Sequence, residues 1–221
     1  MIKYINLFKK NNKIKYISHN TKNSVLICDR GRPGQIYFNS LFALNFNKKK
    51  KYNIIVLSEK KVKSEYNKKL FAAFGIKNFY YLNLKKIDFF FIKSFFLTIY
   101  SLFFLRFSSF DKFVDTFSLN NIYCGDLIWD TYIRYNHSFE NPKIDFKFIK
   151  ILFVSIYKNN FLKNFFLENN IKVVLTSANN YSTLSAFSLR FGVKFKIKTF
   201  FQKFHKIVRI KKFDDIRKSP F

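Results

Sequence analysis

The sequence predicts an α/β fold, in which helices cover both faces of a mostly parallel β-sheet in three layers. Short, continuous apolar runs alternate with longer segments of helical pattern, and the links between them are short. Continuous apolar runs are typical of buried parallel strands, and this alternation fits right-handed crossovers. Strands are expected at residues 24–29, 52–58, 78–82, 171–176 and 193–200. This is the order of a Rossmann-like domain.

The helices between these runs carry recognisable start and stop signals. Pro33 opens a helix expected over 35–46, because proline is favoured at the first helical position. Gly75 ends a helix expected over 59–74, as glycine does in the left-handed position after a helix. Two further helices are expected after the middle of the chain, over 145–168 and over 181–191 with Gly192 closing the latter.

The composition is that of a folded protein with an unusual charge. Of 221 residues, 48% are hydrophobic and 33 are Phe, which is enough apolar surface for a core and excludes a disordered chain. The 41 basic and 13 acidic residues give a net charge of +28. That charge suits an anionic membrane or nucleic acid, but no nucleic-acid-binding signature is present, so nucleic acid is the weaker alternative. A compositional bias toward Lys, Asn, Ile, Phe and Tyr explains the same excess without any ligand.

Cysteine and histidine indicate neither disulfides nor a metal. Cys28 and Cys124, the only cysteines, lie in apolar stretches and are expected to be small buried hydrophobes. The three histidines have no metal-ligand spacing, so no zinc site is expected.

The first ten residues do not resemble a signal peptide, because Lys interrupts their apolar run, and a cytoplasmic protein is expected. The segment 89–107 is strongly apolar, but Lys93 and Arg106 bound a stretch shorter than the roughly 20 apolar residues of a membrane span. We expect a helix that is largely buried or that dips into a bilayer surface; a true span is the less favoured alternative.

Two turns and one helix face carry candidate binding groups. The segment from Arg30 to Gly34 is a basic, glycine-containing turn between a strand and a helix, where an anion can bind, although an ordinary turn explains it as well. Read as a helix from Asp126 onward, the chain places Asp126, Asp130 and Arg134 on one stripe. Two carboxylates and a guanidinium suit a ligand rich in hydroxyls, and a solvated face with salt bridges is the alternative.

That stripe lies in a segment with a family resemblance. Residues 125–134, GDLIWDTYIR, resemble the GDLIYDTYLR segment of bacterial surface-polysaccharide biosynthesis proteins, which are similar to two-domain (GT-B) glycosyltransferases. Residues 175–190 are similar to that family's later strand, polar turn with Tyr, and helix ending in Arg. The family often has His in this turn, where Ala178 and Asn179 stand here.

The resemblance implies the acceptor side of a sugar transfer. Asp126 would be the catalytic base, Asp130 would bind the sugar, and Arg134 would hold Asp130 or an acceptor phosphate. Because ligands of parallel sheets bind beyond the carboxyl ends of the strands, the three segments are expected to share one cleft. The expected binding residues are Gly125, Asp130, Arg134, Ser177, Asn179, Tyr181, Arg30 and Gly34.

The domain organisation follows from the same resemblance. Residues 1–23 would be an N-terminal extension, 24–200 the acceptor-side domain, and 201–221 a basic tail where a donor-binding domain would begin. We expect this chain to bind no cofactor itself, and a nucleotide-sugar donor to require a second domain or a partner. The expected partners are a sugar or lipid-linked glycan acceptor and an anionic membrane surface at the inner face of the cell membrane. A non-catalytic, basic binding module for a membrane or for polysaccharide assembly is the alternative function.

Overall fold

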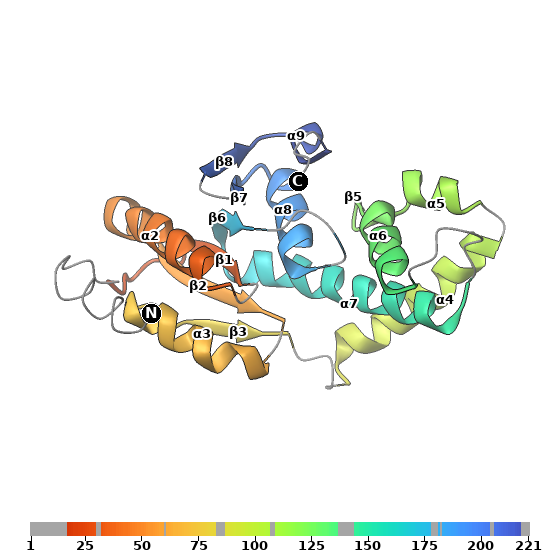
Figure 1. Cartoon of the computed structure of the whole chain (residues 1–221), viewed down its shortest axis with the longest axis horizontal. Helices are drawn as coiled ribbons and strands as arrows, with labels where there is room; N and C mark the ends of the chain where they lie inside the picture. The colour runs from red at the N-terminus through yellow and green to blue at the C-terminus, as the bar shows by residue number, and fades with distance from the viewer. Residues whose placement is uncertain are drawn as a thin grey trace.

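The fold is known from a computed structural model. It describes residues 17–29, 32–59, 61–82, 87–106, 109–136, 144–177, 181, 183–203 and 206–217. These residues form an α/β domain, as the sequence predicts, around one sheet of six strands, one more than expected (Figure 1).

The sheet has the strand order β3-β2-β1-β6-β7-β8. The strands are β1 Ser24–Asp29, β2 Asn53–Ser58, β3 Phe79–Tyr81, β6 Ile171–Thr176, β7 Lys198–Lys203 and β8 Lys206–Ile210. Every neighbouring pair is parallel except β7 and β8. The mostly parallel sheet is therefore confirmed.

The helices cover both faces of this sheet and extend beyond it. They are α2 Pro33–Lys50, α3 Lys61–Ala73, α4 Phe89–Arg106, α5 Phe110–Thr116, α6 Gly125–Asn136, α7 Phe146–Glu168, α8 Leu184–Lys194 and α9 Phe213–Arg217. A two-stranded hairpin, β4 Ser118–Leu119 and β5 Ile122–Tyr123, precedes α6. Figure 1 shows α4, α5 and α6 grouped around the part of α7 that extends past the sheet.

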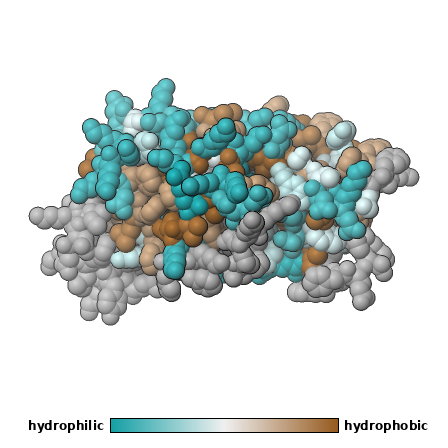
Figure 2. All heavy atoms as spheres, turned by 90° about the horizontal axis from the view of Figure 1, so that it is seen from above, coloured by the Kyte–Doolittle hydropathy of each residue, from teal (hydrophilic) through white to brown (hydrophobic). Residues whose placement is uncertain are grey.

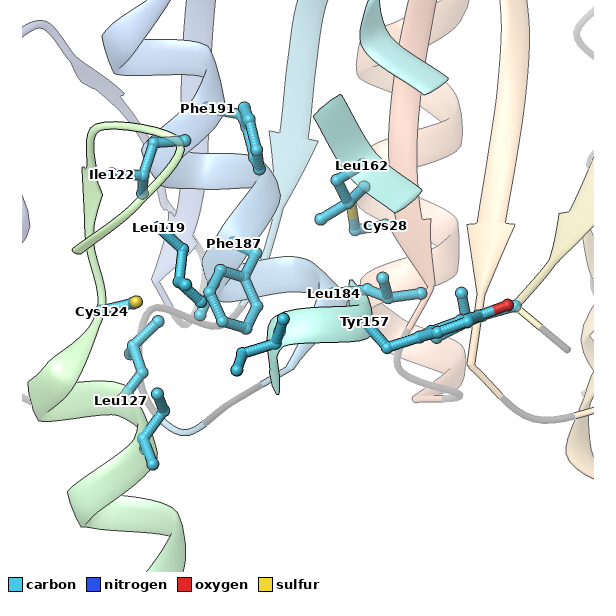
Figure 3. Close-up of a cluster of buried hydrophobic side chains, with 14 of the residues drawn as sticks. Cys28, Leu119, Ile122, Cys124, Leu127, Tyr157, Leu162, Leu184, Phe187 and Phe191 are labelled. Carbon is cyan, nitrogen blue, oxygen red and sulfur yellow. The ribbon is translucent and has the colours of Figure 1, made fainter. Parts of the chain in front are cut away.

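Side chains of β1 show the three layers directly. Val25 and Ile27 belong to a buried cluster with residues of α2 and α3, whereas Leu26 and Cys28 belong to a second cluster with α7 and α8. Successive residues of a strand point to opposite faces, so a strand buried on both sides is apolar throughout. Figure 3 shows the second cluster, where Cys28 faces Leu162 and where Leu119 and Cys124 point toward Phe187.

Local capping explains where the helices begin and end. Pro33 lies in the first turn of α2, and Asp145 caps α7 by accepting a hydrogen bond of 2.7 Å from the Phe148 amide. Thr183 caps α8 in the same way. Gly75 has a left-handed φ of 80° just after α3, as its predicted role requires.

The C-terminal part differs from the prediction. Helix α8 continues through Gly192 to Lys194, so the strand expected at 193–200 begins later, as β7. Gly192 does not stop the helix; it lets α8 approach β7, because a Cβ there would overlap the Thr199 hydroxyl. Residues 201–203 complete β7, and residues 206–217 contain β8 and α9, whose Ile210 and Ile216 share a small core with Leu189 of α8.

The described part of the predicted N-terminal extension is attached to the domain. The Asn47 side-chain amide donates a hydrogen bond of 2.8 Å to the Ile17 carbonyl, and the Asn53 amide donates one of 2.7 Å to the Thr21 carbonyl. Residues 17–23 therefore pack as part of the same unit.

Helix α4 is not largely buried. It packs against α7, but most of its aromatic side chains are exposed. In the described ranges, no helix has both the length and the hydropathy that are needed to cross a bilayer. Figure 2 shows one face of the molecule, on which hydrophilic residues cover much of the surface between smaller hydrophobic patches.

Candidate functional site

Helix α6 carries the predicted stripe and begins with a close contact to α5. Asp126, Asp130 and Arg134 lie on this one helix, as predicted. A Cβ on Gly125 would overlap the Phe113 carbonyl oxygen, so only glycine allows this approach between the two helices. The geometry gives Gly125 a packing role.

Asp126 is paired with Arg190 of α8. The guanidinium donates hydrogen bonds of 2.7 and 2.6 Å to the two carboxylate oxygens and a further one to the Tyr123 carbonyl. Its central carbon lies 5.7 Å from the Tyr123 ring centroid and 5.0 Å from that of Phe213. The Arg190 side chain is 2% exposed and the Asp126 side chain 29%. The two segments of the family resemblance therefore meet in a largely buried ion pair.

Arg190 binds both oxygens of the carboxylate to which the family resemblance assigns a catalytic role. Both oxygens of Asp126 accept from Arg190, and Oδ1 also accepts from the Leu127 amide at 2.8 Å. A catalytic base needs an oxygen directed at the proton that it removes. The role of Asp126 as a base stays a prediction, and the contacts here are those of a structural link between α6 and α8.

Asp130 lies one turn further along α6 and is exposed. Partial loss of solvation raises the pKa of its carboxyl group, the neighbouring Asp126 carboxylate raises it further, and Arg190 opposes both effects. Asp130 therefore retains a proton to higher pH than an ordinary aspartate does.

Arg134, at the end of the stripe, covers the ring of Tyr181. Its guanidinium carbon lies 4.6 Å from the ring centroid, within the range of a cation–π contact. Tyr181 has a φ of 59°, which is uncommon for a bulky residue and is typical of functional turns. The predicted proximity of α6 to the turn after β6 is thus present in this contact.

Arg134 and Tyr181 border a cleft with a volume of about 690 Å³. Its walls come from the end of β2, the turn after β6, and the facing sides of α6 and α7. The lining residues are Glu59, Thr131, Arg134, Tyr135, Lys147, Lys150, Ile151, Val154, Lys158, Tyr181 and Thr183. Four of these are cations and one is a carboxylate, so the cleft favours an anion.

Glu59 organises the inner wall of this cleft. One carboxylate oxygen accepts from Lys158 Nζ at 3.3 Å, and the other accepts from the Leu184 amide at the start of α8. A carboxylate at a helix N-terminus is stabilised by the free amides there. Glu59 is not among the residues predicted from the sequence, although it directly follows a predicted strand, which is the position where ligand-binding groups of parallel sheets gather.

The remaining candidates are dispersed. Ser177 donates a hydrogen bond of 2.9 Å to the Gln35 side chain on α2, and a Cβ added to Gly34 would have no atom within 4 Å. Among the described residues, neither Ser177 nor Asp126 nor Asp130 borders the cleft. Arg30 and Asn179 lie outside the described residues.

In the described ranges, no three His, Cys, Asp or Glu side chains are close enough to hold a metal ion. No family model, curated protein or solved structure matches this chain. The resemblance to surface-polysaccharide proteins therefore stays a prediction, and the cleft is the feature of the molecule that indicates a function.

Proposed function

We propose that the cleft binds a phosphate-bearing saccharide, as the acceptor side of sugar transfer in bacterial surface-polysaccharide synthesis. The observation that carries the proposal is the excess of cations in the cleft: Arg134, Lys147, Lys150 and Lys158 face a single carboxylate, Glu59. The pathway in this proposal is inferred from the family resemblance, and the chemistry of the ligand is inferred from the residues that line the cleft.

The two ends of such a ligand need different partners. Phosphate oxygens accept charge-assisted hydrogen bonds, which Arg134, Lys147 and Lys150 can donate. Sugar hydroxyls both donate and accept, and Glu59, Thr131 and Thr183 offer oxygens of both kinds. A volume of about 690 Å³ lies within the usual range of roughly 300–1,000 Å³ for small-ligand sites.

Transfer itself requires a base for the acceptor hydroxyl and a bound donor. Glu59 borders the cleft and Asp126 is held by Arg190, and both oxygens of each carboxylate accept hydrogen bonds within the fold. In this proposal a second domain or a partner holds the nucleotide-sugar and stabilises the charge on its leaving diphosphate.

Titration calorimetry with inorganic pyrophosphate, glucose 1-phosphate and unphosphorylated glucose tests the ligand class. We expect the phosphorylated probes to bind and the affinity to fall with added salt. The variant Arg134→Ala/Lys150→Ala should bind pyrophosphate about tenfold or more weakly than the unmodified chain, since each charge-assisted hydrogen bond contributes on the order of 1.5–3 kcal/mol to binding.

The matched control is Lys69→Ala/Lys77→Ala, which removes two exposed cations outside the cleft. Equal pyrophosphate affinity in both double variants would contradict the proposal, because binding would then follow net charge alone. Nucleotide release from a panel of nucleotide-sugars, measured with a membrane extract, separates a transferase from the alternative of a non-catalytic binding module.

A further inference from the structure

Helix α4 is buried along its polar side. The fully buried residues of α4 are spaced by four, three and four positions, which is one side of a helix: Ser94, Thr98, Ser101 and Leu105. Beside them, Phe90 and Phe91 pack against rings of α7. The Thr98 and Ser101 hydroxyls donate to carbonyl oxygens one turn earlier, both at 2.7 Å, and Ser94 accepts from Asn160 of α7 at 3.1 Å. The polar groups of this helix are thus satisfied on the inside.

The opposite side of α4 is apolar and exposed to solvent. We call this set the α4 face: Phe89, Ile92, Phe95, Phe96, Ile99, Tyr100, Phe103 and Phe104. Phe96, Tyr100 and Phe103 are 65%, 72% and 61% exposed. The face follows a helix of 18 residues, about 27 Å long, and contiguous apolar patches of this size usually mark an interaction site.

The charge within this face is positive. Residues 89–106 contain no acidic residue, and Lys93 is exposed between the aromatic side chains. Aromatic and aliphatic residues flanked by lysine are typical of helices that lie in the plane of a bilayer, with lysine at the level of the headgroups.

The helix is held in place at its start. Asp88 accepts a hydrogen bond of 2.9 Å from the Phe91 amide, and the Tyr157 hydroxyl of α7 donates one of 3.1 Å to its second carboxylate oxygen. The α4 face is therefore presented by an anchored helix.

We propose that this protein docks on the surface of an anionic phospholipid bilayer through the α4 face, with α4 parallel to the membrane plane. The apolar side chains enter the boundary between headgroups and acyl chains, and Lys93 faces lipid phosphates. Charge complementarity selects this occupant, because a chain with 41 basic and 13 acidic residues is attracted to anionic lipid and repelled by its own copies. The proposal does not depend on the ligand of the cleft.

Vesicle co-sedimentation of the full chain tests the docking. We expect binding to vesicles of equal parts phosphatidylcholine and phosphatidylglycerol, and weaker binding to phosphatidylcholine alone. Phe96→Ser/Tyr100→Ser/Phe103→Ser removes three neighbouring apolar side chains and should lower the partition coefficient more than about tenfold. The matched control, Ile17→Ser/Leu167→Ser/Val208→Ser, removes three exposed apolar side chains elsewhere and should bind as the unmodified chain does.

A fluorescent label gives a second measurement that a folding defect would not mimic. Phe96→Cys places an exposed thiol on the α4 face, while the native Cys28 and Cys124 are buried and free. A polarity-sensitive dye at position 96 should shift to the blue with anionic vesicles and be quenched by spin-labelled lipid. Equal binding of the two triple variants, or a dye that responds to protein concentration and not to vesicles, would overturn the proposal; the latter result indicates a second copy as the occupant.

Discussion

Asp126 and Arg190 are joined by two hydrogen bonds across 64 positions of sequence, at 2.7 and 2.6 Å. The pair connects α6, which begins after the β4–β5 hairpin, to α8, which follows the strand β6. Arg190 also contacts Tyr123 of the hairpin and Phe213 of α9. The guanidinium of Arg190 on α8 therefore contacts α6, α9 and the β4–β5 hairpin, so substitution of its partner Asp126 is expected to affect folding as well as any catalytic role.

Arg190→Ala should destabilise the fold, because it leaves the Asp126 carboxylate without its cation. We expect a loss of about 2–3 kcal/mol in the free energy of unfolding in urea, below the range for fully buried pairs because Asp126 is partly exposed. Asp126→Ala should cost a similar amount, and the double variant less than the sum of the two. Asp111→Asn on the exposed side of α5 is the control. Additive effects of the two substitutions would mean that the ion pair contributes nothing. Since Asp126→Ala alters folding, loss of activity in that variant alone does not identify a catalytic base.

Gly125→Ala should be destabilising although it lies in a helix, where alanine is normally preferred. The added Cβ overlaps the Phe113 carbonyl oxygen, so α5 and α6 must move apart, at about 1–3 kcal/mol. Gly34→Ala is the matched control, because nothing lies near the new Cβ and α2 gains a better helix former. In thermal unfolding, the midpoint temperature of Gly125→Ala should be lower than that of the unmodified chain. The midpoint temperature of Gly34→Ala should be equal to it or higher. The reverse order would contradict the close approach of the two helices.

Asp130→Asn should change the pH dependence of stability. The folded state raises the pKa of this carboxyl group, so it binds the Asp130 proton more tightly than the unfolded chain does. Ionisation of Asp130 therefore lowers stability as pH rises through and above the usual range for aspartate, and asparagine removes this effect. Urea unfolding from pH 3 to pH 7 should show the variant gaining stability relative to the unmodified chain as pH increases. If the difference in free energy of unfolding between the variant and the unmodified chain stayed constant over this range, the raised pKa of Asp130 would be contradicted.

Both native thiols should resist labelling in the folded state. Burial raises the pKa of Cys28 from 9.0 to about 12 and raises that of Cys124 as well. Because the unfolded thiols ionise first, stability should fall as pH rises above about 9, and labelling by iodoacetamide at pH 8 should require opening of the core. The rate of labelling should therefore increase in proportion to the unfolded fraction in urea. Rapid labelling without denaturant would show that one of the thiols is accessible.

Local patterns in the sequence were sufficient for most of the fold. The strands at 24–29 and 171–176 agree with β1 and β6 because an apolar run that is buried on both faces needs no information from distant residues. Pro33 and Gly75 act through their own backbone conformations, so their positions in the sequence were enough to predict where α2 begins and α3 ends. The helical stripe of Asp126, Asp130 and Arg134 follows from spacing alone.

Only the tertiary structure decided what these groups contact. Glu59 and Lys158 meet across 99 positions of sequence, and no periodicity encodes that contact or the cleft beside it. Gly192 looked like a helix stop, but the approach of Thr199 explains it. Helix α4 is apolar on nearly every side, so its composition could not show which side faces α7. In the structure Ser94 is buried against Asn160, where both polar groups are hydrogen-bonded, while Phe95, Phe96, Phe103 and Phe104 are exposed.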